Sequence, residues 1–268
     1  MKRLSNRGYI IPKECLSPHE KRMLNNTLSV SPVNYFNTGL PIRDSDKFKV
    51  FRESETRYRI PRFYGVEHFG LPDVTTLSEG VTVDYTFAGT LKTSLNQHIA
   101  CETILHKLHT KGGSILSLPT GYGKTTCALY ILSQLKKKTL IIVHKEFLMT
   151  QWMERIRQFL PGASIGIIRQ NKIEVKAKDI VIAMLQSLSM KEYEPSLFSS
   201  FGFTIIDEAH HICSKTFSQA LLLSCSKYVL GLSATPERKD GLTCVLHWFL
   251  GNIDYKIERS EQTSVHIY

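Results

Sequence analysis

The sequence lacks several features that define large classes of protein. Its 268 residues include six cysteines, but these form no C-x-x-C pair and no cluster, which argues against a disulfide-stapled domain and a zinc site. No apolar run approaches the roughly 20 residues that cross a bilayer. Residues 1–14 are basic but lack the apolar core of a secretory signal. These absences predict an intracellular protein with reduced thiols, no zinc and no membrane contact.

Acidic residues are also in short supply. The chain has 34 lysines and arginines against 24 acids, a formal net charge of +10. Before Gly89 there are 13 basic and 10 acidic residues, and from Gly89 onward 21 and 14, so the second part carries +7 of the excess. A surplus of this size favours a polyanionic partner, although it also serves simple solubility.

The first chemical motif lies at residues 117–126 (SLPTGYGKTT). An apolar run without helical period, 114–119, precedes it, and residues 125–134 follow with apolar side chains at helical spacing. Strand, glycine turn and helix form the context of a phosphate-binding loop, in which backbone N–H groups and the helix N-terminus face phosphate oxygens. We expect the following residues to bind ATP: Pro119, Thr120, Gly121, Tyr122, Gly123, Lys124, Thr125 and Thr126.

Two side chains of this loop carry its chemistry. Lys124 is expected to reach the β- and γ-phosphates and to act in catalysis, and the Thr125 hydroxyl to bind Mg²⁺. The general pattern G-x-x-x-x-G-K-[ST] has glycine where this chain has Leu118. The competing interpretation, a glycine-rich turn with an incidental surface lysine, leaves the strand and helix on either side unexplained.

A pair of acids ends the next informative run. Residues 203–206 are apolar and β-prone, and Asp207 and Glu208 follow directly. Ligands gather at the carboxyl ends of parallel strands, where the phosphate loop also lies. We therefore expect Asp207 to hold Mg²⁺ and Glu208 to activate the attacking water. The alternatives are a solvated acid pair or zinc on the neighbouring histidines, and the latter lacks further ligands at suitable spacing.

Short β-branched runs recur along the chain at residues 139–143, 180–184 and 228–235, with helical patterns between several of them, such as 146–160 and 214–223. Strands that alternate with helices predict an α/β fold with a parallel sheet sandwiched by helices. Most residues of these runs are expected to be plain core.

With these motifs in place, the chain resembles the superfamily 2 helicases, and among them the DEAH-box group of XPB, phage UvsW-type enzymes and helicases of large DNA viruses. The resemblance covers roughly residues 87–268. It implies a RecA-like lobe, and Leu118 is then expected, since this branch often has L-P-x-G-x-G-K. It also implies that a coupling set reports the nucleotide state, namely His210, Ser233, Ala234 and Thr235.

Other residues gain roles only through this resemblance. Gln97 matches the glutamine that reads adenine, whereas Phe87 is better explained as core. Lys145 is the implied contact with the nucleic-acid backbone. Arg238 and Lys239 fall where related enzymes carry Arg-Glu-Asp, so Lys239 replaces an acid and a basic contact with nucleic acid is equally consistent. In addition, Met184 replaces the usual threonine.

The N-terminal part, residues 1–88, is predicted to be a small α+β accessory domain. Residues 46–64 alternate basic and aromatic side chains, which is typical of a β-hairpin and suits nucleic acid. Arg57 and Arg59 are the candidate contacts. An ordinary half-buried hairpin with outward charges is the stronger alternative, because acids dilute the patch.

The predicted organisation has three parts: the accessory domain at 1–88, an ATP-binding lobe at 89–255, and the start of a linker at 256–268. A second RecA-like lobe, with its Q-x-x-G-R-x-x-R motif, is missing from the sequence. The resulting hypothesis is an ATP-dependent helicase or translocase on duplex or branched DNA, here reduced to its ATP-binding half. There are two alternatives. One is an RNA helicase, and the other is that the chain by itself is an ATP-gated nucleic-acid-binding module with little hydrolysis.

Overall fold

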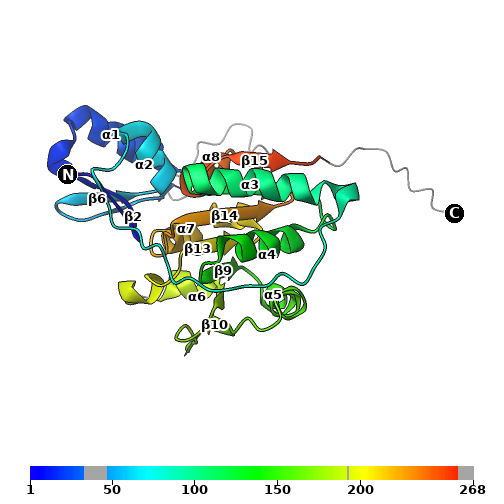
Figure 1. Cartoon of the computed structure of the whole chain (residues 1–268). Helices are drawn as coiled ribbons and strands as arrows, with labels where there is room; N and C mark the ends of the chain where they lie inside the picture. The colour runs from blue at the N-terminus through cyan, green and yellow to red at the C-terminus, as the bar shows by residue number, and fades with distance from the viewer. Residues whose placement is uncertain (33–46, 192, 259–268) are drawn as a thin grey trace.

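The computed structural model describes residues 1–32, 47–191 and 193–258. A small N-terminal unit of strands and two helices lies at one end of a larger α/β unit, at the left of Figure 1. The larger unit has a central sheet with helices on both faces. No helix within these described ranges is long and apolar enough to cross a bilayer.

The central sheet has eight strands in the order β11-β10-β12-β9-β13-β14-β8-β15. All neighbours are parallel except β11, which pairs antiparallel with β10. This topology confirms the predicted α/β fold. The strands are β8 (Gly113–Ser117), β9 (Thr139–Val143), β10 (Ile165–Arg169), β11 (Lys172–Ile173), β12 (Ile180–Met184), β13 (Phe203–Ile206), β14 (Tyr228–Ser233) and β15 (Ile253–Lys256).

Alternating side chains of these strands feed two separate apolar cores. Leu116 belongs to the core under α3, α4 and α5, whereas its neighbour Ile115 belongs to the core under α6, α7 and α8. Burial on both faces explains why the strands read as continuous apolar runs. The helices are α3 (Gln97–Lys111), α4 (Lys124–Leu135), α5 (Glu146–Phe159), α6 (Leu185–Met190), α7 (Lys215–Leu221) and α8 (Thr243–Leu250), with short 3₁₀ turns η3 (Thr93–Leu95), η4 (Pro195–Phe198) and η5 (Ala209–Ile212).

The N-terminal unit contains a five-stranded sheet in the order β5-β6-β2-β1-β7. Ser17 starts the first helix with a reciprocal capping box to Glu20, so the helix begins at Pro18. The elements are β1 (Arg3–Ser5), β2 (Gly8–Pro12), η1 (Lys13–Cys15), α1 (Pro18–Thr27), β3 (Ser29–Val30), β4 (Phe48–Lys49), β5 (Arg52–Glu53), β6 (Arg57–Ile60), α2 (Arg62–Phe69) and β7 (Val74–Thr75).

The hairpin predicted over 46–64 is shorter than expected, and residue 46 lies outside the described ranges. Only β5 and β6 pair as a hairpin, while β4 pairs with β3. The stretch after Pro61 is helical, because proline sets an extended conformation before the first turn of α2. Tyr64 is consequently fully buried against Trp248 of α8, with ring centroids 5.5 Å apart.

The two units share one apolar core, which includes Tyr9 and Tyr64 of the N-terminal unit and Val245 of α8. Arg62 is half-buried between them and donates to the backbone oxygens of Lys227 (2.7 Å), Ser226 and Lys111. The predicted division at residues 88 and 89 remains a proposal. The backbone of residues 81–88 bonds to the α/β unit through Val81, Val83 and Ala88.

Candidate nucleotide-binding and hydrolysis site

The carboxyl ends of the parallel strands bring the predicted motifs to one edge of the sheet. Ser117 of β8 is paired with Ser233 of β14, and Leu118 N–H donates to the Ser233 carbonyl oxygen at 3.2 Å. Asp207 N–H donates to the carbonyl of Ile142 on β9. An open cavity of about 770 Å³ lies at this edge, and its lining includes the phosphate loop, Gln97, Asp207, Glu208 and His210.

The phosphate loop has the backbone that its glycines permit. Gly121 and Gly123 adopt φ values of 88° and 84°, a region that favours glycine, and α4 begins at Lys124. Lys124 Nζ donates to the carbonyl oxygen of Leu118 at 3.1 Å, so the amine lies folded over the loop. The Leu118 side chain is fully buried in the core beneath α3 and α4, which accounts for an apolar residue in place of glycine.

Gln97 lies behind the phosphate loop rather than free in solvent. Only 2% of its surface is exposed. Its Oε1 accepts from Lys92 N–H at 2.8 Å, and its Nε2 donates to the Tyr122 carbonyl at 2.9 Å. The predicted adenine-reading residue therefore ties the segment before α3 to the phosphate loop. Phe87, expected to be core, stacks on Phe159 with ring planes 13° apart.

The two acids after β13 have different environments. Burial raises the pKa of the Asp207 carboxyl. The hydrogen bond from Trp152 has the opposite effect and lowers this pKa. Trp152 Nε1 donates to Asp207 Oδ2 at 2.8 Å, and Glu208 N–H donates to Oδ1 at 3.0 Å. Glu208 itself has left-handed backbone angles, φ 47° and ψ 56°. Such strain in a non-glycine residue persists only where the surroundings impose it, and it commonly marks functional sites.

The site offers oxygen donors suited to Mg²⁺. The Thr125 side chain and the Asp207 carboxylate both border the cavity. Mg²⁺ prefers one or two protein oxygens completed by phosphate oxygens and waters, so this donor set fits the ion. Across the described part of the chain, no group of three His, Cys, Asp or Glu side chains could hold a metal by itself.

A chain of polar contacts connects the acids to the end of β14. His210 Nδ1 lies 3.5 Å from Glu208 Oε2 and 3.1 Å from Ser233 Oγ. Ser233 Oγ also accepts from Thr235 N–H at 3.1 Å, with Ala234 between them. Burial, with Arg238 and Lys124 nearby, lowers the pKa of His210, so a neutral imidazole is favoured. The predicted coupling residues therefore form one contiguous network.

The predicted nucleic-acid contacts are not gathered in one place. Arg238 is engaged internally, with its guanidinium on Asp240 and on the His210 carbonyl oxygen, and its contact with nucleic acid stays a prediction. Lys239 is exposed, and exposed Lys145 borders the cavity. Arg57 and Arg59 lie on β6 in the N-terminal unit.

Sequence reasoning did not anticipate three features of the site. The contact from Trp152 to Asp207 joins residues 55 positions apart, and its only signal is that a buried indole requires an acceptor. Arg155 borders the cavity one turn further along α5. The rings of His144 and His211 pack against each other at a tilt of 34°, with centroids 3.8 Å apart, a pairing without any sequence signal.

Known proteins similar to this chain are helicases. "Putative ATP-dependent RNA helicase L396" of Acanthamoeba polyphaga mimivirus is 33% identical over 248 residues, covering 92% of this chain and 47% of that protein. "DNA 3'-5' translocase XPB2" of Sulfurisphaera tokodaii is 41% identical over 142 residues, covering 53% of this chain and 31% of that protein. The chain thus spans about half, or less, of the length of these curated relatives.

Solved structures share the fold. The UvsW helicase from bacteriophage T4 has a TM-score of 0.55 at 16% identity, with 88% of this chain and 93% of that chain covered. The Sulfolobus solfataricus SWI2/SNF2 ATPase core in complex with dsDNA has a TM-score of 0.53 at 21% identity, with 62% and 37% covered. The family described as "Type III restriction enzyme, res subunit" matches residues 90–238, more than half of the chain. The predicted resemblance is confirmed: the chain belongs to this family of superfamily 2 helicases.

Proposed function

We propose that this chain is the ATP-binding part of an ATP-dependent DNA helicase or translocase. Its helicase family implies the use of ATP, usually with Mg²⁺. The observation that supports the proposal most is the meeting of the phosphate loop, the acid pair and the His210–Ser233 contact at one cavity. A cavity of about 770 Å³ is large enough for a nucleoside triphosphate.

Each residue then has a part in hydrolysis. Lys124 leaves the Leu118 carbonyl for the β- and γ-phosphates, and Thr125 with Asp207 would hold Mg²⁺. When bound, the ion neutralises the charge that develops on the phosphate oxygens. Glu208 orients the attacking water and accepts its proton. The phosphate loop and the N-terminus of α4 bind the remaining phosphate charge.

His210 is the proposed reporter of nucleotide state. It contacts both Glu208 and Ser233, so a shift of the acid on hydrolysis changes the contact with the end of β14. Ser233 passes the change to the Thr235 backbone. Repeated over many cycles, such changes would alternate the grip on nucleic acid.

The proposed polymer is DNA, and RNA is the second candidate. One relative's name contains RNA helicase and another's DNA translocase. We favour DNA because the sequence resembles XPB-like enzymes in its phosphate loop and in the residues after Thr235. Stimulation of ATP hydrolysis by duplex RNA but not by duplex DNA would instead support an RNA helicase.

The deciding experiment is steady-state ATP hydrolysis by this chain with and without duplex DNA, with Lys124→Ala as the blank. We expect ATP binding with weak turnover, because the arginines that a second lobe supplies contribute about three to five decades of rate. Glu208→Gln should retain binding and lose the residual turnover, whereas Lys124→Ala should lose binding. Normal hydrolysis by Glu208→Gln would show that Glu208 is not the base.

A further inference from the structure

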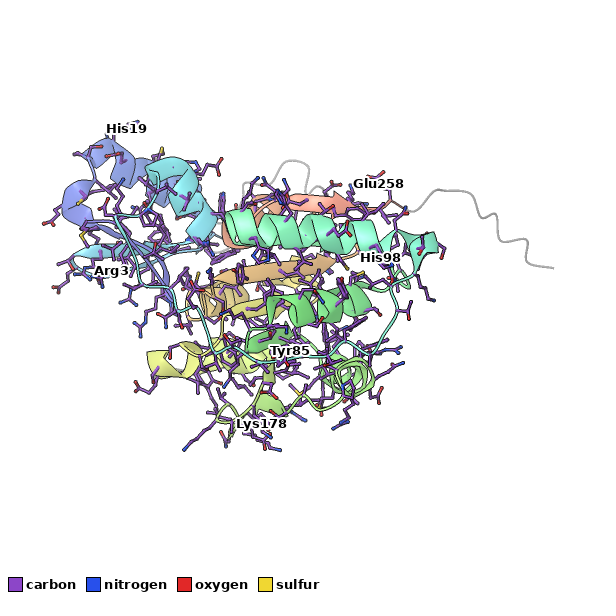
Figure 2. All side chains as sticks on the ribbon, viewed as in Figure 1. Arg3, His19, Tyr85, His98, Lys178 and Glu258 are labelled. Atoms are coloured by element: carbon purple, nitrogen blue, oxygen red, sulfur yellow. The ribbon has the colours of Figure 1, made fainter. Side chains whose placement is uncertain are left out.

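The sheet of the N-terminal unit presents one face that α1 does not cover. On β6, Tyr58 and Ile60 point inward and are buried, while Arg57 and Arg59 point to the other side. Asn25 of α1 reaches the Tyr58 hydroxyl at 3.3 Å, which places α1 on the inner side. Figure 2 likewise shows His19 of α1 and Arg3 of β1 on opposite sides of the unit. The outer face is therefore the one that α1 leaves uncovered.

Arginines gather on this outer face without acidic partners. Arg52 and Arg59 are directly opposite each other in the β5–β6 ladder, an arrangement of like charges that destabilises a sheet. Burial lowers the pKa of Arg59, and the charges of Arg7, Arg52 and Arg57 lower it further. Among the described residues, no hydrogen bond or ion pair involves the guanidinium of Arg7 or Arg59.

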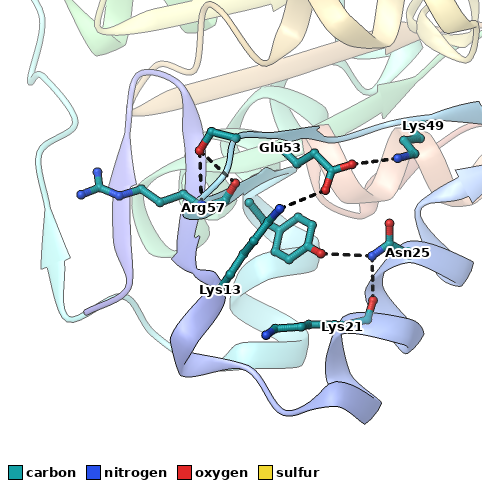
Figure 3. A network of polar contacts seen from close by, with 8 residues as sticks. Lys13, Lys21, Asn25, Lys49, Glu53 and Arg57 are labelled. Carbon is teal, nitrogen blue, oxygen red and sulfur yellow. Dashed lines mark hydrogen bonds and ion pairs between the residues drawn. The ribbon is translucent and has the colours of Figure 1, made fainter.

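Glu53, one of the two acids of this hairpin, is engaged elsewhere. Glu53 binds Lys13 at 3.3 Å and Lys49 at 2.9 Å, and the bond from Lys49 lowers its pKa most. Figure 3 shows this network, with the Arg57 guanidinium extending away from it. The positive charge of the outer face is therefore not neutralised by Glu53.

The arginines border a cavity at the junction of the two units. Arg7, Arg52 and Arg59 line it from the N-terminal unit and Lys191 from the α/β unit, in a space of about 430 Å³ whose described lining includes no acid. Arg52 also donates to Gln219 of α7 at 2.9 Å, and this bond holds β5 against the α/β unit. We name these four basic residues and the space between them the junction groove.

The junction groove lies one short helix away from the nucleotide edge. Gln186, at the start of α6, donates to the His144 carbonyl next to Lys145 at 2.7 Å. α6 has 6 residues, so about 9 Å separate its two ends, and Lys191 follows its last residue. Phosphates of one strand are spaced about 3.4 Å along a duplex axis. A single strand that contacts Lys145 and follows α6 therefore leads to the groove.

We propose that the junction groove binds backbone phosphates of the nucleic acid on which the lobe acts. This proposal rests on the proposed function, since it extends the nucleic-acid path from the α/β unit onto the N-terminal unit. Guanidinium groups bind phosphate bidentately, and a phosphate would relieve the repulsion between Arg52 and Arg59. Phosphate contacts carry no sequence information, so the groove positions the polymer without selecting bases.

The test is the salt dependence of binding of a fluorescent duplex DNA with a single-stranded extension. Arg7→Gln with Arg59→Gln removes two charges from the groove. The matched control, Arg22→Gln with Lys176→Gln, removes two exposed charges, one from α1 and one from the loop before β12. We expect the groove pair to weaken binding at least about tenfold near 0.1 M salt and to reduce the slope of log K against log salt by about 1 to 2. The control pair should leave both unchanged.

Each other outcome has a defined meaning. If both pairs weaken binding equally, or if the slope does not change, the groove is not a phosphate site. If polyglutamate competes as well as DNA, the groove binds acidic proteins and the proposal is overturned. If the unaltered chain binds no nucleic acid at any salt, the proposed function fails together with the groove. Retained affinity for a fluorescent ATP analogue shows that the variants are folded.

Discussion

At the scale of single residues, the site depends on groups that never touch substrate. Trp152 donates to Asp207, and this bond opposes the effect of burial on the pKa of the carboxyl. A carboxylate must be deprotonated to bind Mg²⁺, so the indole widens the pH range over which the proposed ligand is ready. The second tryptophan, Trp248, lies against Tyr64 instead and provides a natural control.

Trp152→Phe should weaken Mg²⁺-dependent nucleotide binding by about tenfold or more, the usual effect of losing a bond to a metal ligand. Without the indole N–H, burial should raise the pKa of Asp207 further, so the pH midpoint for binding moves upward. The measurement is Mg²⁺ titration of a fluorescent ATP analogue across pH. Trp248→Phe should show no such shift, and an identical response of both variants would contradict the role.

His144 gives a second prediction at this scale. Burial lowers its pKa to about 4, helped by His211 and Lys145. The folded-state pKa lies below the unfolded value of about 6.5, so its contribution to stability is complete above pH 6.5 and is lost as the pH falls toward 4. Thermal unfolding should show a smaller loss of Tm between pH 7 and 5 in His144→Gln than in the unaltered chain. The exposed-site variant His19→Gln should retain the full loss.

At the scale of elements, α3 and the phosphate loop act as one piece. Gln97 at the start of α3 binds the Tyr122 carbonyl, and a Cβ on Gly123 would collide with the Gln97 amide. The amide could rotate away, but it is buried and would lose its acceptor. Gly121, which has a similar φ, faces open space. A substitution at Gly121 therefore tests backbone strain alone, whereas one at Gly123 tests backbone strain together with the contact to α3.

Gly121→Ala should cost about 1–2 kcal/mol of unfolding free energy from backbone strain alone. Gly123→Ala should cost at least about 1 kcal/mol more, since the displaced amide is left unsatisfied. Chemical denaturation of both variants measures the difference. Combining Gly123→Ala with Gln97→Ala should recover the extra loss, and strictly additive effects would show that Gln97 is not involved.

Prediction from sequence worked where an element is fully buried. β8, β9, β12, β13 and β14 lie inside the sheet, and their unbroken apolar runs revealed both the fold and the strand ends that carry the motifs. β10 and β15 gave a weaker signal, because half-exposed positions interrupt their apolar pattern. The start of α2, after Pro61, was predicted as part of a strand because the pattern of basic and aromatic residues continues through residue 64.

The residues of the candidate site likewise fall into two groups, those that the sequence predicts and those that only the packing reveals. Lys124, Asp207 and Glu208 could be placed because each follows directly from a strand and a spacing that chemistry requires. The contact from Trp152 to Asp207 and the internal binding of Arg238 could not, because both depend on how α5 and the turn after β14 pack in space.

At the scale of the whole molecule, Arg62 joins the two units. Its side chain is half-buried, and burial lowers the pKa of the guanidinium. It donates to backbone oxygens at the end of α3 and before β14. The N-terminal unit is therefore attached by polar bonds inside a shared apolar contact.

Arg62→Met should reduce the unfolding free energy by about 2–4 kcal/mol, because carbonyl oxygens at the contact between the units lose a charged donor. Cleavage by a protease within the N-terminal unit should become faster. Arg22→Met, on the exposed side of α1, should stay within about 0.5 kcal/mol. Equal protease resistance of Arg62→Met and the unaltered chain would show that packing alone holds the units together.

The apolar cluster shared by Tyr9, Tyr64 and Val245 limits how this protein can be divided or recombined. A shortened chain that starts at Gly89 would expose the face of α8 that α2 now covers, including Trp248, and would tend to aggregate. For the same reason, the N-terminal unit cannot be exchanged for that of a relative unless the matching face of α8 is exchanged with it. Substitutions on the two sides of this contact should accordingly be inherited together.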